Sequence, residues 1–322
     1  MKKVIFVGGT SYSGSTLLDM ILSNDPGAYS LGEVIALFKP FRKHYLEERE
    51  KLLADNQSMW QEILQKGADS LYPLLQKSYG DEREFYVDSS KNPFWIARQT
   101  KILKKLGIEV KNVLIYKEKE DLLQSFKKRN RFDKWENNYL KYHVAYPKLI
   151  DEFFTISYKE LTQNPESSLK QLCQYLEIDW FPEKHAFWQK EEQTTFFGND
   201  RTRYHKLKDK SNIPETADTT AIDEGNDYQK IYYRPCTDTS VIEHVQERVK
   251  QNPNLLKIEQ LLHSINMQER NHVPPPVTNS TVHFSLSWAR YNARQTVYKL
   301  FGPSLFLMEE KMLRKKYENV AG

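Results

Sequence analysis

The chain has 322 residues, 39% of them hydrophobic and 28% charged, which suits one large soluble α/β domain or two smaller ones. The net charge is only +4 and both signs are mixed along the chain, which argues against a nucleic-acid-binding protein with a concentrated basic face. The two cysteines, Cys173 and Cys236, are far apart and lack zinc-binding spacing, so we expect neither a disulfide framework nor a zinc site.

The chain begins with a short apolar run, Val4-Ile5-Phe6-Val7, that ends at Gly8. Such a run is too short for a secretory leader or a membrane span, so we expect a cytoplasmic protein without a transmembrane segment. Its β-branched composition predicts a buried strand over residues 3–7. A turn-rich loop follows, and then a helix is predicted over residues 15–24, closed by Asn24-Asp25-Pro26-Gly27.

Strand signals continue to alternate with helical signals along the first half of the chain. Further strands are predicted over residues 84–87, 110–116 and 153–157, and helices over 35–80, 94–106, 120–129 and 135–151, with another opened by Asn164-Pro165. This alternation predicts a three-layer α/β/α fold with a central parallel sheet and helical insertions. A sheet of this kind binds ligands in the crevice beyond the carboxyl ends of its strands.

The second half of the chain has a different character. Residues 194–240 have no clear period and predict a long irregular segment, after which a helix over 241–267 is expected to be interrupted near Pro253. A run of three prolines divides a main domain, residues 1–270, from a helical C-terminal tail, residues 271–322. Because the tail mixes aromatic and basic residues, it fits a dimerisation helix, a membrane-surface helix or an added core element.

Glycines and hydroxyl side chains gather directly after the first predicted strand. Their spacing is G-x-x-x-x-G-x-T, as in a Walker A loop, except that Ser15 replaces the lysine. In such a P-loop-like turn, backbone N–H groups and the start of a helix bind an anion. The missing lysine argues against an ordinary kinase or ATPase. The predicted anion-binding residues are Gly9, Thr10, Ser11, Tyr12, Ser13, Gly14, Ser15 and Thr16.

Ser-Gly-Ser-Thr-Leu-Leu at 13–18, with the segments 22–26 and 31–33, resembles the 5'-phosphosulfate loop region of one enzyme superfamily. These are the sulfotransferases that use 3'-phosphoadenosine 5'-phosphosulfate (PAPS), and the chain is most similar to the bacterial and the tyrosylprotein families. The resemblance implies PAPS as the sulfuryl donor and no metal. Those families usually carry Arg or Lys where this chain has Tyr12.

A second motif, Asp88-Ser89-Ser90-Lys91, follows the second predicted strand. It resembles the Asp-Ser-Ser-Lys turn of bacterial sulfotransferases, and the continuation through Asn92-Pro93-Phe94 is similar to a turn of tyrosylprotein sulfotransferases. A lysine in this place is expected to donate to the bridging oxygen of the donor as charge builds on the leaving group. A solvated surface lysine is the alternative.

Lys117 ends the third predicted strand, and Ser125 follows eight residues on. In the resembling families an Arg and a Ser at this spacing clamp the 3'-phosphate, so Lys117 and Ser125 are expected to do so here. Arg129 lies one helical turn beyond Ser125 and joins them as a candidate. A charged helix surface is the alternative for these residues.

Two further segments carry the resemblance. Tyr158 matches a family position near the nucleotide, with a structural tyrosine as the alternative. Residues 197–203 resemble a loop that covers the nucleotide in bacterial members, so Arg201 and Arg203 are candidates for contact with the 3'-phosphate. Two solvated arginines are the alternative there.

Sulfuryl transfer requires a base that removes the proton of the attacking hydroxyl. Glu33 follows Gly32 in a predicted turn, and the matching Glu is the proposed base in tyrosylprotein sulfotransferases. His44, His143 and His205 are the substitutes, each of which is otherwise an ordinary surface or core histidine. No clustered carboxylates indicate a magnesium site.

These motifs together predict a sulfotransferase that moves a sulfuryl group from PAPS to a hydroxyl of a small molecule, lipid or glycan. Two alternatives stay open: a P-loop nucleotide kinase, and a nucleotide-binding relic without catalysis. The substitutions at Tyr12 and Lys117 favour the relic, whereas Glu33, Lys91 and Ser125 favour the enzyme.

Overall fold

The computed structural model describes residues 2–39, 43–54, 58–79, 83–189 and 232–266, with the single positions Thr202, Tyr228, Ala289 and Ala293. Within these residues the strands are β1 (Lys3–Gly8), β2 (Ala28–Gly32), β3 (Phe85–Lys91), β4 (Glu109–Tyr116) and β5 (Phe154–Ser157). The helices of the first half are α1 (Ser15–Leu22), α2 (Ile35–Phe38), α3 (Lys43–Ala54), α4 (Ser58–Lys66), α5 (Leu71–Tyr79) and α6 (Pro93–Lys105). They are followed by α7 (Lys119–Lys127), α8 (Trp135–Leu149), α9 (Tyr158–Gln163), α10 (Pro165–Leu176), α14 (Thr239–Gln251) and α15 (Asn254–Asn266).

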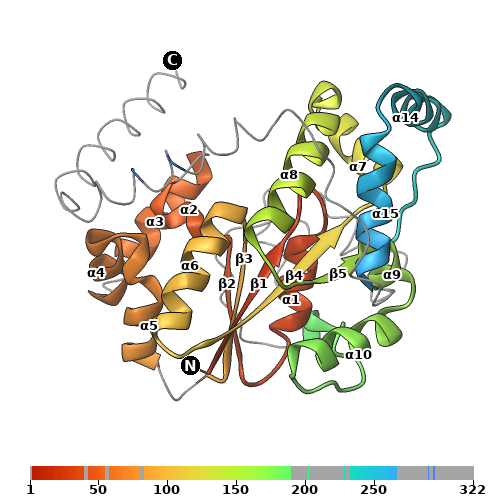
Figure 1. Cartoon of the computed structure of the whole chain (residues 1–322). Helices are drawn as coiled ribbons and strands as arrows, with labels where there is room; N and C mark the ends of the chain where they lie inside the picture. The colour runs from red at the N-terminus through yellow and green to blue at the C-terminus, as the bar shows by residue number, and fades with distance from the viewer. Residues whose placement is uncertain are drawn as a thin grey trace, which may run out of the picture.

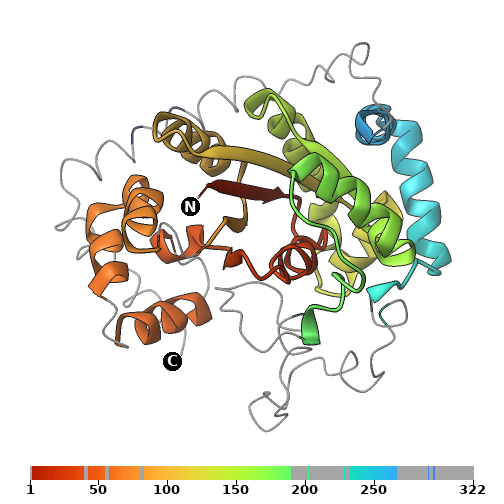
Figure 2. The ribbon, with the colours of Figure 1, turned by 90° about the horizontal axis from the view of Figure 1, so that it is seen from below.

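The strands form one parallel sheet in the order β2-β3-β1-β4-β5. The central strand β1 is apolar on both faces, as a strand covered from both sides must be. Its Val4 and Phe6 belong to one hydrophobic cluster, whereas Ile5 and Val7 belong to the other. Helices lie on both sides of the sheet (Figures 1 and 2), which confirms the predicted α/β/α fold with a central parallel sheet.

The connections between strands leave the sheet on opposite faces at β1. Helix α1, which leads from β1 to β2, packs with α10 in the cluster that contains Ile5. Helices α6 and α8, which lead to β4 and to β5, pack in the cluster that contains Val4. The carboxyl end of β1 is therefore the switch point of the sheet, where folds of this class bind their ligands.

One strand was not predicted from the sequence. The structure has β2 over Ala28–Gly32 where the sequence indicates only a turn, and Glu33 follows this strand directly. The strand is five residues long, contains a serine and is flanked by Gly27, so it lacks the apolar run that identifies a buried strand. Among the described strands it pairs with β3 alone, at the edge of the sheet.

The second predicted strand is longer than expected. β3 continues to Lys91, so the motif 88–91 lies within the strand and not after it. Asp and Ser disfavour strands, which is why the apolar pattern ends at Val87. In the structure the side chains of Asp88 and Ser89 are buried. Both form hydrogen bonds inside the sheet, which replace the hydrogen bonds to water that burial removes.

The helical expectations agree with the structure. The insertion over 35–80 contains α2 to α5, and its Trp60 and Ile63 are buried. Helices α14 and α15 are separated at Pro253, and α15 packs on β5 and α8 at the opposite edge of the sheet (Figure 1).

In the ranges given above, no helix is both long and apolar enough to cross a bilayer. The predicted tail 271–322 lies outside the described residues except for Ala289 and Ala293.

Candidate functional site

The predicted phosphate loop curls between the end of β1 and the start of α1. The N–H of Ser13 donates to the carbonyl of Thr10 at 3.2 Å and closes the turn. The side chains of Thr10 and Ser13 are 3% and 0% exposed, and their hydroxyl oxygens have no hydrogen-bond partner in the described part of the chain. Ser15 and Thr16 are buried in the first turn of α1, and Ser11 is exposed. Orphaned buried hydroxyls are rare in proteins, so this loop has the donors and acceptors of a ligand cradle.

Two glycines allow the loop to approach its neighbours closely. A Cβ atom at Gly9 would lie 2.8 Å from the carbonyl oxygen of Ile115 in β4. Gly14 caps α1 with a φ of 99°, a conformation that glycine adopts without strain. A Cβ atom there would lie 2.6 Å from Cε2 of Tyr158. Both positions therefore require glycine for steric reasons.

Lys117, Ser125 and Tyr158 meet on one side of this loop. The ammonium of Lys117 lies 4.2 Å from the ring centroid of Tyr158, a cation–π contact, and 3.4 Å from the hydroxyl oxygen of Ser125. The Tyr158 hydroxyl donates to the carbonyl of Tyr232 at 2.8 Å, which fixes the ring. The structure thus brings Tyr158 together with Lys117 and Ser125, which the sequence places in a different motif.

Arg129 joins the same side of the loop through Tyr12. Helix α7 ends at Lys127, and its terminal turn contains the left-handed Asn130, with a φ of 53°. From this turn Arg129 donates to the carbonyl of Ser125 at 3.1 Å, and its guanidinium carbon lies 4.3 Å from the ring centroid of Tyr12. A positive charge therefore lies at the phosphate loop, supplied by the turn after α7 and not by the loop itself.

Glu33 and Lys91 form an ion pair at the carboxyl ends of β2 and β3. Their side chains are 9% and 20% exposed, so the pair is partly shielded from water. The Tyr45 hydroxyl, from α3, donates to the second carboxylate oxygen of Glu33 at 3.4 Å. Lys91 has a φ of 65°, which is unusual for a residue with a side chain.

Two buried carboxyl groups lie beneath this pair. Asp88 accepts hydrogen bonds from the Tyr72 hydroxyl at 2.7 Å and the Trp95 indole at 2.8 Å. Burial raises the pKa of Asp88, and these donors oppose the rise. The second group, Asp19 of α1, was missed by the sequence analysis although it is a lone acid in an apolar helix, which was a usable signal.

Asp19 links three elements through serine hydroxyls. It accepts from Ser30 of β2 at 2.6 Å and from Ser89 of β3 at 2.5 Å, and also from Ser23 at 3.2 Å. Burial raises the pKa of Asp19 to about 7, the serine hydroxyls lower it, and the nearby Asp88 adds to the rise. The carboxyl group fastens α1 to the two strands that carry Glu33 and Lys91.

Tyr142 of α8 is a further residue that the sequence does not single out. The N–H of Gly9 donates to its hydroxyl oxygen at 2.7 Å, and this hydroxyl donates to the carbonyl of Lys91 at 2.6 Å. The phenol therefore bridges the phosphate loop and the lysine. Nothing in the local pattern distinguishes it from Tyr139 and Tyr146 on the same helix.

The remaining candidates do not reach this site or fall outside the described residues. His143 is buried in the core, where desolvation lowers its pKa to about 4 and its Nδ1 lies 2.9 Å from the carbonyl oxygen of Tyr139. Arg201, Arg203 and His205 lie outside the described residues, as does the side chain of His44. In the described ranges no three His, Cys, Asp or Glu side chains are grouped to hold a metal ion.

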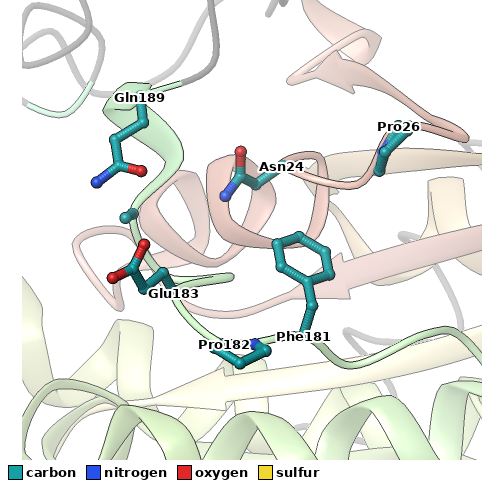
Figure 3. Close-up of a pocket in the computed structure, with 7 residues that line it drawn as sticks. Asn24, Pro26, Phe181, Pro182, Glu183 and Gln189 are labelled. Atoms are coloured by element: carbon teal, nitrogen blue, oxygen red, sulfur yellow. The ribbon is translucent and has the colours of Figure 1, made fainter.

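A surface pocket of about 440 Å³ lies at the other end of α1 (Figure 3). It is bounded by Asn24 and Pro26, after α1, and by Phe181, Pro182 and Glu183. Because α1 starts at the phosphate loop and ends near this pocket, the pocket is not the crevice at the carboxyl ends of the strands. It contains none of the predicted site residues.

Known proteins resemble this chain in structure and not in sequence. No protein-family model matches the chain, and no curated protein matches its sequence. The structure matches those of bacterial sulfotransferase domains. The sulfotransferase domain of the curacin biosynthetic pathway is 16% identical over 90% of this chain and 98% of its own, with a TM-score of 0.46.

Two other solved structures are similar. The sulfotransferase domain of the Synechococcus PCC 7002 olefin synthase is 14% identical over 89% of this chain and 94% of its own, with a TM-score of 0.43. The sulfotransferase STF9 of Mycobacterium avium is 12% identical over 64% of this chain and 73% of its own, with a TM-score of 0.34.

Proposed function

We propose that this protein transfers a sulfuryl group from PAPS to a hydroxyl group of a small molecule, lipid or glycan. The observation that supports this most directly is the ion pair of Glu33 and Lys91 at the carboxyl ends of β2 and β3, where Lys91 pairs with Gly8 at the start of the phosphate loop. A carboxylate base and an ammonium for the leaving group are the two charged groups that such a transfer needs.

The residues around the phosphate loop fit the charges of the donor. The orphaned hydroxyls of Thr10 and Ser13, with the amino end of α1, suit the 5' end of the donor. Lys117 and Ser125 suit its 3'-phosphate, since they present an ammonium and a hydroxyl side by side. Arg129 supplies, through its contact with Tyr12, the positive charge that related loops carry at position 12.

When bound, the donor supplies a sulfuryl group held by a labile bond to phosphate. Glu33 takes the proton of the acceptor hydroxyl as the hydroxyl oxygen bonds to sulfur. Lys91 stabilises the charge that develops on the bridging oxygen as the sulfur–oxygen bond breaks. The acceptor gains the sulfuryl group, its proton remains on Glu33, and 3'-phosphoadenosine 5'-phosphate (PAP) leaves.

Thermal-shift measurements with PAP and with Mg-ATP test the donor class first. We expect PAP to raise the unfolding temperature and Mg-ATP to leave it unchanged. A shift with Mg-ATP alone would favour the nucleotide kinase. Turnover of radiolabelled PAPS with a panel of alcohols, phenols, sterols and glycans then separates the enzyme from a binding relic, which would bind PAP without turnover.

A carboxylate variant tests the role of the base. Glu33→Gln is expected to lower kcat at least about 100-fold and to change PAP affinity less than about threefold, because the amide keeps its size but accepts no proton. Glu62→Gln is the matched control, since Glu62 forms an exposed ion pair with Lys66 on α4. Full activity of Glu33→Gln would mean that another residue takes the proton.

A further inference from the structure

Tyr142 continues the pairing of β1 and β3 past the point where the backbone ladder stops. The register between these strands shifts between Phe6 and Gly8, and the last pair joins Gly8 with Lys91. Just beyond it, the N–H of Gly9 donates to the Tyr142 hydroxyl oxygen at 2.7 Å, and that hydroxyl donates to the carbonyl of Lys91 at 2.6 Å.

The backbone of Lys91 needs such a restraint. Its φ of 65° places a residue with a side chain in the left-handed region, which is unfavourable unless neighbouring contacts hold it there. On its other side, Asn92 caps α6 by accepting from the N–H groups of Phe94 and Trp95. Lys91 is thus fixed between a helix cap that follows it and a phenol that holds its carbonyl.

The phenol is itself firmly placed. The Tyr142 ring stacks on Tyr146, one helical turn further along α8, with centroids 5.7 Å apart and planes inclined by 25°. Its hydroxyl uses one accepted and one donated hydrogen bond, and the two bonds polarise each other. A small change at this hydroxyl would move the loop and the lysine relative to each other.

We propose that Tyr142 is a positioning residue: its hydroxyl holds Lys91 in a left-handed conformation against Gly9 and so aims the ammonium at Glu33 and at the donor. This role rests on the proposed function, because it assigns Tyr142 an effect on the group that Lys91 stabilises. Tyr142 touches neither reactant in this scheme.

Removal of one hydroxyl tests the proposal. Tyr142→Phe is expected to lower kcat about 10- to 100-fold, since displacement of a reacting group by about 1 Å has effects of that size, with the KM for PAPS within about threefold. Tyr146→Phe is the matched control on the same helix. Its hydroxyl donates to the carbonyl of Val113 at 3.4 Å and, among the described residues, not to the carbonyl of Lys91, so kcat should stay within about threefold.

A double-mutant cycle separates positioning from a general structural effect. If Tyr142 acts through Lys91, the variant Lys91→Ala with Tyr142→Phe should turn over as slowly as Lys91→Ala alone. Wild-type kcat in Tyr142→Phe, equal losses in the two Tyr variants, or a further loss of tenfold or more in the double variant would each overturn the proposal.

A measurement that does not require turnover tests the role of Tyr142 independently of the proposed function. Hydrogen exchange of the Gly9 amide should be at least tenfold faster in Tyr142→Phe than in wild type, and unchanged in Tyr146→Phe. If the wild-type protein fails to turn over PAPS, the proposed function fails, and faster exchange still supports the restraint by Tyr142. Unchanged exchange of Gly9 in Tyr142→Phe would overturn the restraint whatever the activity.

Discussion

The carboxylate of Glu33 and the ammonium of Lys91 form an ion pair although 58 positions separate them in the sequence. Each residue lies at the carboxyl end of its strand, and β2 and β3 are neighbours in the sheet. The register of this strand pair shifts between Ser30 and Gly32, just before Glu33. The irregular end of the sheet, and not a continuous ladder, therefore sets the place of both charges.

The left-handed backbone of Lys91 leads to a prediction about stability. Lys91→Gly and Lys91→Ala both remove the ammonium and leave Glu33 unpaired, but only glycine adopts a φ of 65° without strain. Lys91→Gly should therefore be more stable than Lys91→Ala by roughly 1 kcal/mol in urea unfolding. Both should lose PAPS turnover about 100-fold or more. Equal stability of the two variants would argue against a strained backbone at this position.

The 3'-phosphate site is tested by a comparison of nucleotides. Lys117→Ala should weaken PAP binding about 10- to 100-fold in calorimetry, because a charge-assisted hydrogen bond is lost, and should change binding of adenosine 5'-phosphate much less. Lys111→Ala is the control. Lys111 is on β4, whereas Lys117 directly follows this strand, and Lys111 is likewise near a tyrosine ring, at 5.4 Å from the centroid of Tyr175, but it is ion-paired with Glu177. An equal loss for both nucleotides would place Lys117 elsewhere on the ligand.

Local patterns were sufficient to predict most of this fold. Apolar runs such as 3–7 predict buried strands, and the spacing of Gly9, Gly14 and Thr16 identifies the phosphate loop, because both features depend on residues close in sequence. The strand β2 and the end of β3 could not be found in this way. Their serines, Ser30 and Ser89, are stabilised inside the sheet by Asp19, up to 70 positions away.

The same limit applies to the candidate site. Lys91 and Lys117 were identified at the ends of predicted strands and Glu33 in a predicted turn, each through the resemblance of its motif to known sulfotransferases. Tyr142 was not identified, because its role depends on the backbone groups of Gly9 and Lys91. These residues are 133 and 51 positions away in the sequence, so no local pattern connects them with α8. Side chains that bridge between elements are therefore the part of this site that only the structure reveals.

The raised pKa of Asp19 predicts a dependence of stability on pH. Its folded-state pKa of about 7 lies above the ordinary value of 3.8, so between these values the folded state binds more protons than the unfolded state. The free energy of unfolding contributed by Asp19 therefore falls as pH rises from about 4 to 7, by up to about 1.4 kcal/mol per pH unit, and is constant above 7. Asp19→Asn lacks this dependence.

Urea unfolding of wild type and Asp19→Asn between pH 4.5 and 7.5 measures the effect. The stability of the variant relative to wild type should increase with pH across this window and then level off. Asp238→Asn is the control, because the hydrogen bond from Lys127 lowers the Asp238 pKa to about 2, below the window. A constant difference between wild type and Asp19→Asn would mean that Asp19 titrates normally.

A comparison of Gly14→Ala with Gly107→Ala separates the steric requirement for glycine in the phosphate loop from the backbone strain of a positive φ. Both glycines have positive φ, 99° and 70°, so alanine at either place carries a similar backbone cost of about 1 kcal/mol. At Gly14 the added Cβ would meet the ring of Tyr158, whereas at Gly107 no described residue beyond its chain neighbours has an atom within 4 Å of it. Gly14→Ala should therefore be the less stable variant by roughly 1–3 kcal/mol.

A second substitution tests whether Tyr158 is the cause. In a Tyr158→Ala background the additional cost of Gly14→Ala should fall to that of Gly107→Ala, because the obstructing ring is gone. PAP should stabilise Gly107→Ala as it does wild type, and should fail to stabilise Gly14→Ala, whose loop no longer fits between α1 and Tyr158. If Gly14→Ala and Gly107→Ala proved equally stable and bound PAP equally well, the close contact between the loop and Tyr158 would be wrong, and the cradle argued from it would be wrong too.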